Sequence, residues 1–254
     1  MAKVTFQSEK HLGIVTIDSP PVNALDRQVL SELAEVLDEI DEKVHAVIVT
    51  GAGGKAFVAG ADIKEFPELK GEEGVELCQR GQQIFGKLAG LPQPTIAAID
   101  GYALGGGLEL ALACDFRVAS AKSMLGLPET SLGVIPGYGG TQRLARLIGT
   151  GKAKRMIFTA EPVQAEEALR IGLIERLVEE DALAAAKEEA ANILKRGPLA
   201  VRAAKRAVDS GLALPLTEGL ALEAEQFGRL FDSEDKNEGV AAFMEKRAPQ
   251  FRGK

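Results

Sequence analysis

The chain has 254 residues, of which 46% are hydrophobic, and this is enough for one large core or a core with an appendage. Its formal net charge of −7 argues against a general nucleic-acid-binding surface or an anionic-membrane surface. We therefore expect a small-molecule partner. The first ten residues lack the apolar core of a signal peptide, and no uncharged apolar stretch is long enough to span a membrane. These features predict a cytoplasmic protein without a nucleic-acid or membrane partner.

Cysteines and histidines are scarce. Cys78 and Cys114 lie far apart and form no CxxC pattern, which indicates reduced thiols rather than a disulfide framework or a metal site. His11 and His45 are the only histidines, so the chain offers few residues that could form a zinc site or a Ser-His-Asp triad. We interpret all four residues as structural and expect no metal. If the protein is an enzyme, carboxylates must carry the proton transfer.

The first third of the chain predicts two strands, a helix and a third strand. Residues 4–10 and 12–18 are typical of short strands, and Asp26 is placed to cap a helix with apolar residues at 3.6-residue spacing. Residues 46–50 lack polar alternation, as in a parallel strand buried on both faces. Asp62 is placed to cap a short helical turn.

Further along, residues 72–91 predict a helix interrupted by Gly81 and Gly86, and strands are expected at 95–99, 115–119, 123–127 and 173–178. Together these elements predict an α/β protein built from strand–strand–helix units. Helices dominate the remainder, at residues 165–171, 182–195, 199–208, 216–231 and 239–247. We place a domain boundary after residue 195, which divides the chain into a core at 1–195 and a helical region at 196–254. The last helices carry apolar faces expected to dock on a subunit core, at Leu220, Phe227, Phe231, Val240 and Phe243.

A glycine-rich turn organises the chain. The expected strand at 95–99 leads through Gly101 and the run Gly105, Gly106, Gly107 into a helix that begins near Leu108. Three adjacent glycines suit a place where something passes close to the backbone, beside the unpaired N–H groups of a helix start. Glu109 follows in the first helical turn among apolar neighbours. The stretch therefore predicts an oxyanion hole beside an acid/base carboxylate.

Two familiar glycine motifs are incomplete. Leu110 stands where a dinucleotide-binding fingerprint needs its third small residue, which argues against a Rossmann-type oxidoreductase. Residues 50–56 lack the first glycine and the final Ser or Thr of a phosphate loop. A later loop, residues 133–140, is also rich in glycine and follows a helical turn opened by Pro128 and Glu129.

Several motifs in sequence order resemble the crotonase superfamily, and specifically its enoyl-CoA hydratases. The resemblance covers essentially the whole chain and is carried by residues 22–25, 56–63, 105–109 with 128–129, 135–144 and 243–251. It implies a crotonase-type superhelix of repeated β-β-α units with a C-terminal helical trimerisation region. It also implies homotrimers, commonly paired into homohexamers, and no prosthetic group, with a coenzyme A thioester as the substrate.

The resemblance implies a role for each matching residue. The backbone N–H groups of Ala61 and Gly106 match an oxyanion hole that polarises the thioester carbonyl. Glu109 and Glu129 fall where the hydratases have their two glutamates, which hold the water, and Glu129 supplies the C2 proton. The N–H group of Gly137 helps to orient that water. Desolvation and like charge are expected to raise the pKa of at least one glutamate.

Substrate and CoA contacts are also implied by the resemblance. They fall on the first loop, on the backbone after residue 58, on the glycine-rich loop at residues 133–140 and on the C-terminal motif. The residues are Val22, Ala24, Ala59, Gly60, Asp62, Ile63, Lys64, Gly137, Phe243 and Lys246. Lys64, and Lys246 from a neighbouring subunit, are candidates for the phosphates. The first loop departs from the family because Ser19, Pro20 and Pro21 precede Val22 without the basic residue that many hydratases have there.

The sequence leaves alternatives to a trans-2-enoyl-CoA hydratase of fatty-acid or related acyl-CoA degradation. Superfamily members share the oxyanion hole and differ in their acid/base residues, so the fold alone does not give the reaction. A hydratase for a branched or carboxylated enoyl-CoA, an enoyl-CoA isomerase and a non-catalytic binding relative all stay open. The presence of both glutamates counts against the last two. Tyr138 stands beside the expected pocket, and Arg143 is interpreted as structural or interfacial.

Overall fold

Two sheets form the body of the protein, and the computed structural model describes residues 2–254 apart from the side chains of Glu65, Pro67 and Glu68. The larger sheet has the order β1-β2-β3-β5-β7-β10, in which β1 is antiparallel to β2 and the other pairs are parallel. Its strands are β1 (Val4–Glu9), β2 (Leu12–Ile17), β3 (Ala46–Gly51), β5 (Thr95–Ile99), β7 (Phe116–Ser120) and β10 (Arg176–Val178). The smaller sheet contains β4 (Ala56–Val58), β6 (Tyr102–Leu104), β8 (Met124–Gly126) and β9 (Val163–Gln164).

The helices complete a fourfold repetition. They are α1 (Arg27–Glu39), α2 (Gly71–Ala89), α3 (Gly106–Leu112), α4 (Gly140–Ile148), α5 (Thr150–Thr159), α6 (Ala165–Ile171), α7 (Ala182–Ile193), α8 (Pro198–Gly211), α9 (Leu216–Leu230) and α10 (Glu234–Glu245). Short 3₁₀ turns, η1 (Ile63–Glu68) and η2 (Glu129–Leu132), precede α2 and α4. The order β1-β2-α1, β3-β4-α2, β5-β6-α3, β7-β8-α4 confirms the predicted α/β class and its strand–strand–helix unit. From the second unit on, the second strand of each unit joins the smaller sheet.

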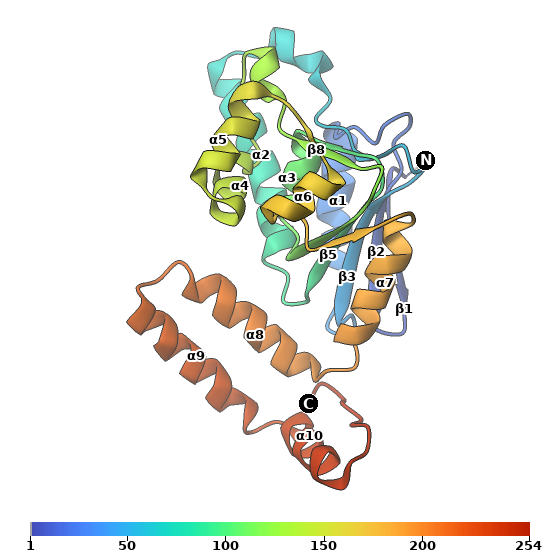
Figure 1. Cartoon of the computed structure of the whole chain (residues 1–254), viewed down its shortest axis with the longest axis vertical. Helices are drawn as coiled ribbons and strands as arrows, with labels where there is room; N and C mark the ends of the chain where they lie inside the picture. The colour runs from blue at the N-terminus through green and yellow to red at the C-terminus, as the bar shows by residue number, and fades with distance from the viewer. Residues whose placement is uncertain (1) are drawn as a thin grey trace.

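The position of strand β3 inside the sheet explains why residues 46–49 are all apolar. Alternate side chains of a strand point to opposite faces of the sheet. Ala46 and Ile48 pack with the alanines of α7 on one face, whereas Val47 and Val49 belong to the main core on the other. Figure 1 shows α7 lying along the strands of the larger sheet. Both faces of the central strands are therefore buried, as the sequence predicted.

The capping signals predicted at Asp26 and Asp62 are confirmed. The Asp26 side chain accepts a hydrogen bond from the Val29 N–H and begins α1. Asp62 caps η1 in the same way through the Lys64 N–H. Gly172 ends α6 in the left-handed conformation, with φ of 81°. These short signals could be predicted because donor and acceptor lie within three residues of each other.

Three sequence expectations need correction. Helix α2 continues through Gly81 and Gly86, which were expected to interrupt it. A Cβ atom on Gly81 would overlap the Tyr138 ring, so this glycine serves close packing. The strands β4 and β6 were missed because each has only three residues, too few to establish a period. The last helix begins at Glu234, capped by Ser233, rather than at Gly239.

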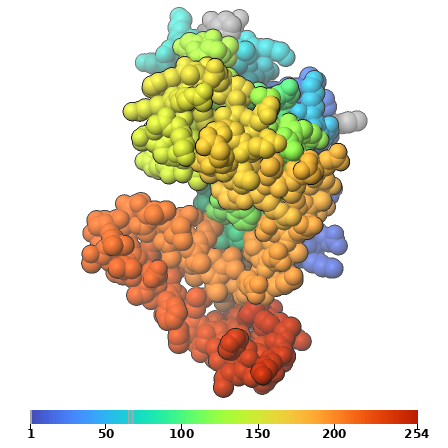
Figure 2. All heavy atoms as spheres, in the orientation of Figure 1, coloured from blue at the N-terminus to red at the C-terminus, as the bar shows by residue number. Residues whose placement is uncertain are grey.

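The C-terminal helices project away from the body. Figure 1 shows α8 and α9 side by side and antiparallel, with α10 beyond them, and Figure 2 shows this region as a mass distinct from the rest. The predicted boundary after residue 195 falls between α7 and α8. The apolar faces do not dock on the chain's own body, since Phe227 is 63% exposed and Phe243 is 85% exposed. Among residues 2–254, no helix has the length and apolarity needed to cross a membrane.

Candidate active site

A cavity of about 1300 Å³ opens between the first loop, the loop before η1, helix α2, the glycine turn and the loop after η2. It contains twelve of the fourteen residues predicted for the site. These are Val22, Ala24, Ala59, Gly60, Ala61, Asp62, Ile63, Lys64, Gly106, Glu109, Glu129 and Gly137. Phe243 and Lys246 do not line it, because α10 places them in the projecting C-terminal region.

The glycine turn places the start of α3 against strand β4. Gly105 has φ of 52° and ψ of −126°, a conformation that side-chain-bearing residues rarely adopt. A Cβ atom on Gly107 would overlap the Val58 carbonyl. The close approach inferred from the sequence is therefore made, at Gly107, by the chain's own backbone. This contact sets α3 directly beside the segment that carries Ala61.

The N–H groups of Ala61 and Gly106 lie close together at the cavity. An ideal Cβ atom built on Gly106 would be 3.5 Å from the Ala61 nitrogen. Gly106 is the first residue of α3, so its N–H has no acceptor within the helix. Ala61 pairs with Leu25 in a bridge whose hydrogen bonds are made by its neighbours, Gly60 O and Asp62 N. Two backbone donors can therefore meet one oxygen atom of a bound molecule.

Glu109 is a buried carboxyl group held by backbone donors. Its Oε1 atom accepts hydrogen bonds of 2.7 Å from the N–H groups of Tyr138 and Gly140, and the residue is only 2% exposed. Burial, with a smaller contribution from the nearby Glu129 carboxyl group, raises the pKa of Glu109 from its ordinary 4.5 to about 7, although the two backbone hydrogen bonds act in the opposite direction. Glu109 can therefore exchange a proton near neutral pH.

Glu129 faces the same cavity from η2. Its Oε2 atom is buried and has no hydrogen-bond partner among the described residues, and desolvation raises the pKa of the carboxyl group. Its Oε1 atom lies 3.0 Å from where a Cβ atom on Gly105 would be. Glycine at that position therefore keeps space for the carboxyl group. An unpaired carboxyl oxygen in a cavity is available to a bound water or substrate.

We predict that Glu109→Gln stabilises the fold above pH 7. The raised pKa means that protonated Glu109 favours the folded state below pH 4.5, and this contribution is lost as pH rises through 7. The loss amounts to roughly 3 kcal/mol by the usual conversion of a pKa shift. Glutamine keeps the oxygen acceptor and carries no charge. Urea unfolding at fixed protein concentration should show the wild type losing stability relative to the variant between pH 4.5 and 7.5. Parallel curves would contradict the prediction.

The first loop is clamped by Asn23. Its amide nitrogen donates to the carbonyls of Ala52 and Ala56, at 3.0 and 2.9 Å, and its oxygen accepts from the Ser19 N–H at 2.9 Å. Asn23 has φ of 57°, which turns the chain sharply at this point. Val22 and Ala24, on either side of Asn23, line the cavity. The asparagine of the motif thus positions the loop.

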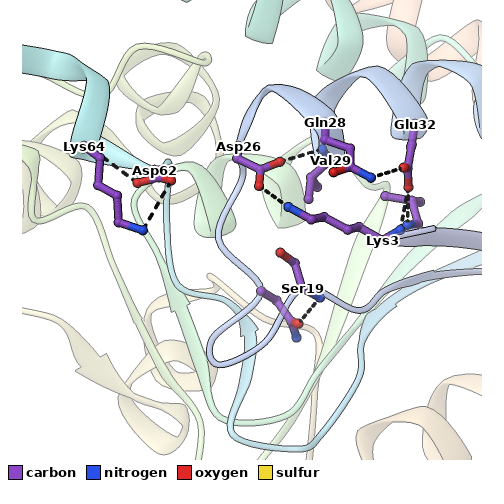
Figure 3. Close-up of polar contacts among 10 residues, drawn as sticks. Lys3, Ser19, Asp26, Gln28, Val29, Glu32, Asp62 and Lys64 are labelled. Atoms are coloured by element: carbon purple, nitrogen blue, oxygen red, sulfur yellow. Dashed lines mark hydrogen bonds and ion pairs between the residues drawn. The ribbon is translucent and has the colours of Figure 1, made fainter. Parts of the chain in front are cut away.

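Two acid–base pairs lie at the cavity (Figure 3). Lys64 is 3.9 Å from Asp62, and its side chain is 87% exposed and free to reach an anionic ligand. Lys3 pairs with Asp26 and also lines the cavity, although no motif in the sequence marks it as a site residue. The Lys3 backbone N–H donates to Glu32 at 2.6 Å, which fixes the chain just before β1. Lys3 therefore supplies a cation close to the first loop, where a basic residue is lacking.

Three further lining residues were not assigned to the site from the sequence. Cys78, interpreted there as structural, and Gln82 lie on α2 beside the loop after η2, and Tyr138 packs against Phe85 at 5.6 Å between ring centroids. His11 and His45 stack 4.2 Å apart, away from the cavity. Arg143 donates to the Tyr138 carbonyl at 3.1 Å, which fits its structural interpretation.

Comparison with known proteins gives consistent matches over nearly the full chain. The family described as Enoyl-CoA hydratase/isomerase matches residues 7–254. A short-chain-enoyl-CoA hydratase of Clostridium acetobutylicum is 46% identical over 96% of this chain and 95% of its own. A crotonyl-CoA hydratase of Syntrophomonas wolfei is 41% identical over 98% and 97%. The crystal structure of an enoyl-CoA hydratase from Bacillus anthracis, 40% identical, superposes with a TM-score of 0.95 and covers 99% of this chain and 100% of that one.

Proposed function

Because the chain belongs to the enoyl-CoA hydratase/isomerase family, we propose that it is an enoyl-CoA hydratase acting on trans-2-enoyl-CoA. The reaction adds water reversibly and gives the 3-hydroxyacyl-CoA. The observation that carries this proposal is the pair of carboxyl groups, Glu109 and Glu129, which face one cavity with raised pKa values. An isomerase moves a double bond without adding water, so it does not need two carboxyl groups to hold a water molecule.

The catalytic roles follow from the placement of these groups. The thioester oxygen accepts hydrogen bonds from the Ala61 and Gly106 N–H groups, which stabilise the negative charge that develops on it. Glu109 and Glu129 hold a water molecule near C3, and the Gly137 N–H helps to orient it. As the water oxygen bonds to C3, one water O–H bond breaks and its proton passes to the ionised Glu109, while the protonated Glu129 delivers its proton to C2. Proton exchange with the solvent then returns both carboxyl groups to their starting states. The sum is one water molecule added across the double bond.

The same cavity accommodates the rest of the substrate. Val22, Ala24 and the backbone of residues 59–63 hold the adenine and pantetheine parts, and Lys64 pairs with a phosphate. Phe243 and Lys246 reach the CoA of a neighbouring subunit. No prosthetic group takes part, since backbone donors and carboxyl groups supply the whole chemistry of the addition.

The enzyme serves fatty-acid or related acyl-CoA degradation, in which a 2-enoyl thioester must be hydrated before the C3 position is oxidised. Both cysteines, Cys78 and Cys114, are free thiols, which suits a reducing compartment, so we assign the enzyme to the cytoplasm. Its partner is the acyl-CoA substrate, and the proposal includes no nucleic acid or membrane.

The direct test is hydration of crotonyl-CoA, followed by the loss of ultraviolet absorbance of the conjugated enoyl thioester. Purified protein should remove this absorbance and form 3-hydroxybutyryl-CoA. A protein that binds CoA esters without turnover would contradict the hydratase assignment. A protein that converts only 3-enoyl-CoA into 2-enoyl-CoA would instead be an isomerase.

We also predict a homotrimer or a pair of trimers in solution. Other subunits would cover the exposed apolar side chains of the C-terminal helices. These are Leu212, Leu216, Leu220, Phe227, Phe231, Val240, Phe243 and Met244. Light scattering after size-exclusion chromatography should give a mass of three or six chains. Phe227→Asp should lower the mass, whereas Glu223→Gln, on the same helix, should not. A monomeric wild type would also remove the role given to Lys246.

A further inference from the structure

The loop after η2 has a second set of contacts, on the side that faces away from Glu109. Its Tyr138 and Gly140 N–H groups point to the Glu109 carboxyl group, as described above. The Gly137 carbonyl accepts hydrogen bonds from Cys78 Sγ at 2.6 Å and from Gln82 Nε2 at 2.9 Å. Both donors belong to α2, which is 55 residues or more away in sequence. The loop is therefore held between α2 and Glu109.

One peptide group connects the two sets of contacts. The Gly137 carbonyl and the Tyr138 N–H belong to the same planar unit, so fixing one fixes the direction of the other. Hydrogen-bond donors on a peptide oxygen also polarise the group and strengthen its N–H as a donor. Contacts made by Cys78 and Gln82 thus act on the hydrogen bond that Tyr138 donates to Glu109.

The two side chains are suited to act together. Cys78 and Gln82 are four residues apart, so they lie on one face of α2, and Gln82 Nε2 is also 3.1 Å from Cys78 Sγ. A carbonyl oxygen has two lone pairs and can accept both donors. A Cβ atom on Gly137 would lie 3.5 Å from Cys78 Sγ, so the thiol packs directly against this backbone.

We propose that Cys78 and Gln82 are positioning residues for the reaction, because they fix the Gly137–Tyr138 peptide group and thereby aim its N–H at Glu109. The proposal deepens the hydratase function and rests on it for its kinetic test. Neither residue takes or gives the reacting proton. Both act through Tyr138 N–H, on the geometry and the charge of Glu109.

The expected effect of losing these donors has a definite sign. A weaker Tyr138 N–H stabilises the ionised Glu109 less, so the pKa of Glu109 rises further above its ordinary value. In a plot of kcat/KM against pH, the fall of activity on the acid side (the acid limb) then moves to higher pH. We expect kcat to fall about 3- to 10-fold in Cys78→Ala or Gln82→Ala and about 10- to 100-fold in the double variant, from the usual worth of hydrogen bonds. KM should stay within about twofold, since the roles concern the reacting water.

The kinetic experiment uses full-length protein and crotonyl-CoA across a range of pH. Cys78→Ser keeps a donor and should retain more activity than Cys78→Ala, with the acid limb near that of the wild type. Gln83→Ala, exposed on the same helix, is the matched control and should leave kcat and the pH profile unchanged. A role in packing alone would change the melting temperature or KM without moving the acid limb. If the double variant keeps both kcat and the acid limb of the wild type, the proposal is overturned.

A second readout needs no substrate and separates this proposal from the hydratase assignment. Carbon NMR of protein labelled at the glutamate carboxyl groups, assigned with Glu109→Gln, follows the titration of Glu109 directly. Its midpoint should lie at higher pH in Cys78→Ala/Gln82→Ala than in the wild type. This result would stand even if the wild type failed to hydrate crotonyl-CoA, whereas an unchanged midpoint would overturn the positioning role even in an active hydratase.

Discussion

Glu109→Gln and Glu129→Gln are each expected to lower kcat for crotonyl-CoA hydration by about 10²–10⁴-fold. Glutamine has nearly the shape of glutamate but neither accepts nor delivers a proton at these pH values. In Glu109→Gln the amide oxygen can still accept the hydrogen bonds from the two backbone N–H groups. The loss of activity therefore reports acid/base chemistry rather than collapse of the loop. Steady-state kinetics of the two variants, with circular dichroism to verify the fold, makes the test.

The double variant sharpens the interpretation. Two carboxyl groups that hold one water act as a unit, so losing the second after the first should cost far less than the product of the single losses. Glu166→Gln is the matched control, because Glu166 also stands in the first turn of a helix but is exposed. Single variants that keep more than a tenth of wild-type activity would contradict the two-glutamate mechanism.

The sequence could predict the groups that lie close to a strong local signal. Glu109 was identifiable because a carboxylate followed a glycine run inside an otherwise apolar helix, and an apolar context both buries the group and raises its pKa. The cap at Asp62 and the strand at residues 46–50 were predictable for the same reason, since their patterns span only a few residues. The family resemblance then supplied the roles of the backbone N–H groups, for which residue type carries no signal.

Groups that meet through the fold could not be predicted in this way. Lys3 reaches the cavity only because β1 lies beside the first loop, and nothing in its neighbours marks it. Cys78 and Gln82 meet Gly137 only because α2 lies along the loop after η2. Their acceptor is a backbone carbonyl oxygen, which every residue has, so residue type does not reveal the contact. The apolar residues of α9 and α10 were predictable as a face, but the chain's own body does not cover them.

The oxyanion hole can be tested by removing a single hydrogen-bond donor. Gly106 is the first residue of α3, the helical position that best accepts proline, because its N–H has no acceptor within the helix. Gly106→Pro therefore removes the donor while α3 can still form. A Cβ atom at this position would approach Leu25 Cδ1 at 3.1 Å and Tyr138 Cδ2 at 3.4 Å. Gly106→Ala introduces the same Cβ atom and keeps the N–H, so it serves as the matched control.

We expect kcat of Gly106→Pro to be about 10²–10³-fold below that of Gly106→Ala, the usual effect of losing one oxyanion donor. The Ala61 N–H remains, so activity should fall without vanishing. Binding of CoA, measured by calorimetry, should be similar in the two variants because the adenine and pantetheine contacts lie elsewhere in the cavity. Equal kcat values for folded proline and alanine variants would show that the Gly106 N–H does not stabilise the transition state. The helix start would then serve only to place Glu109, and the charge on the thioester oxygen would need another donor beside Ala61.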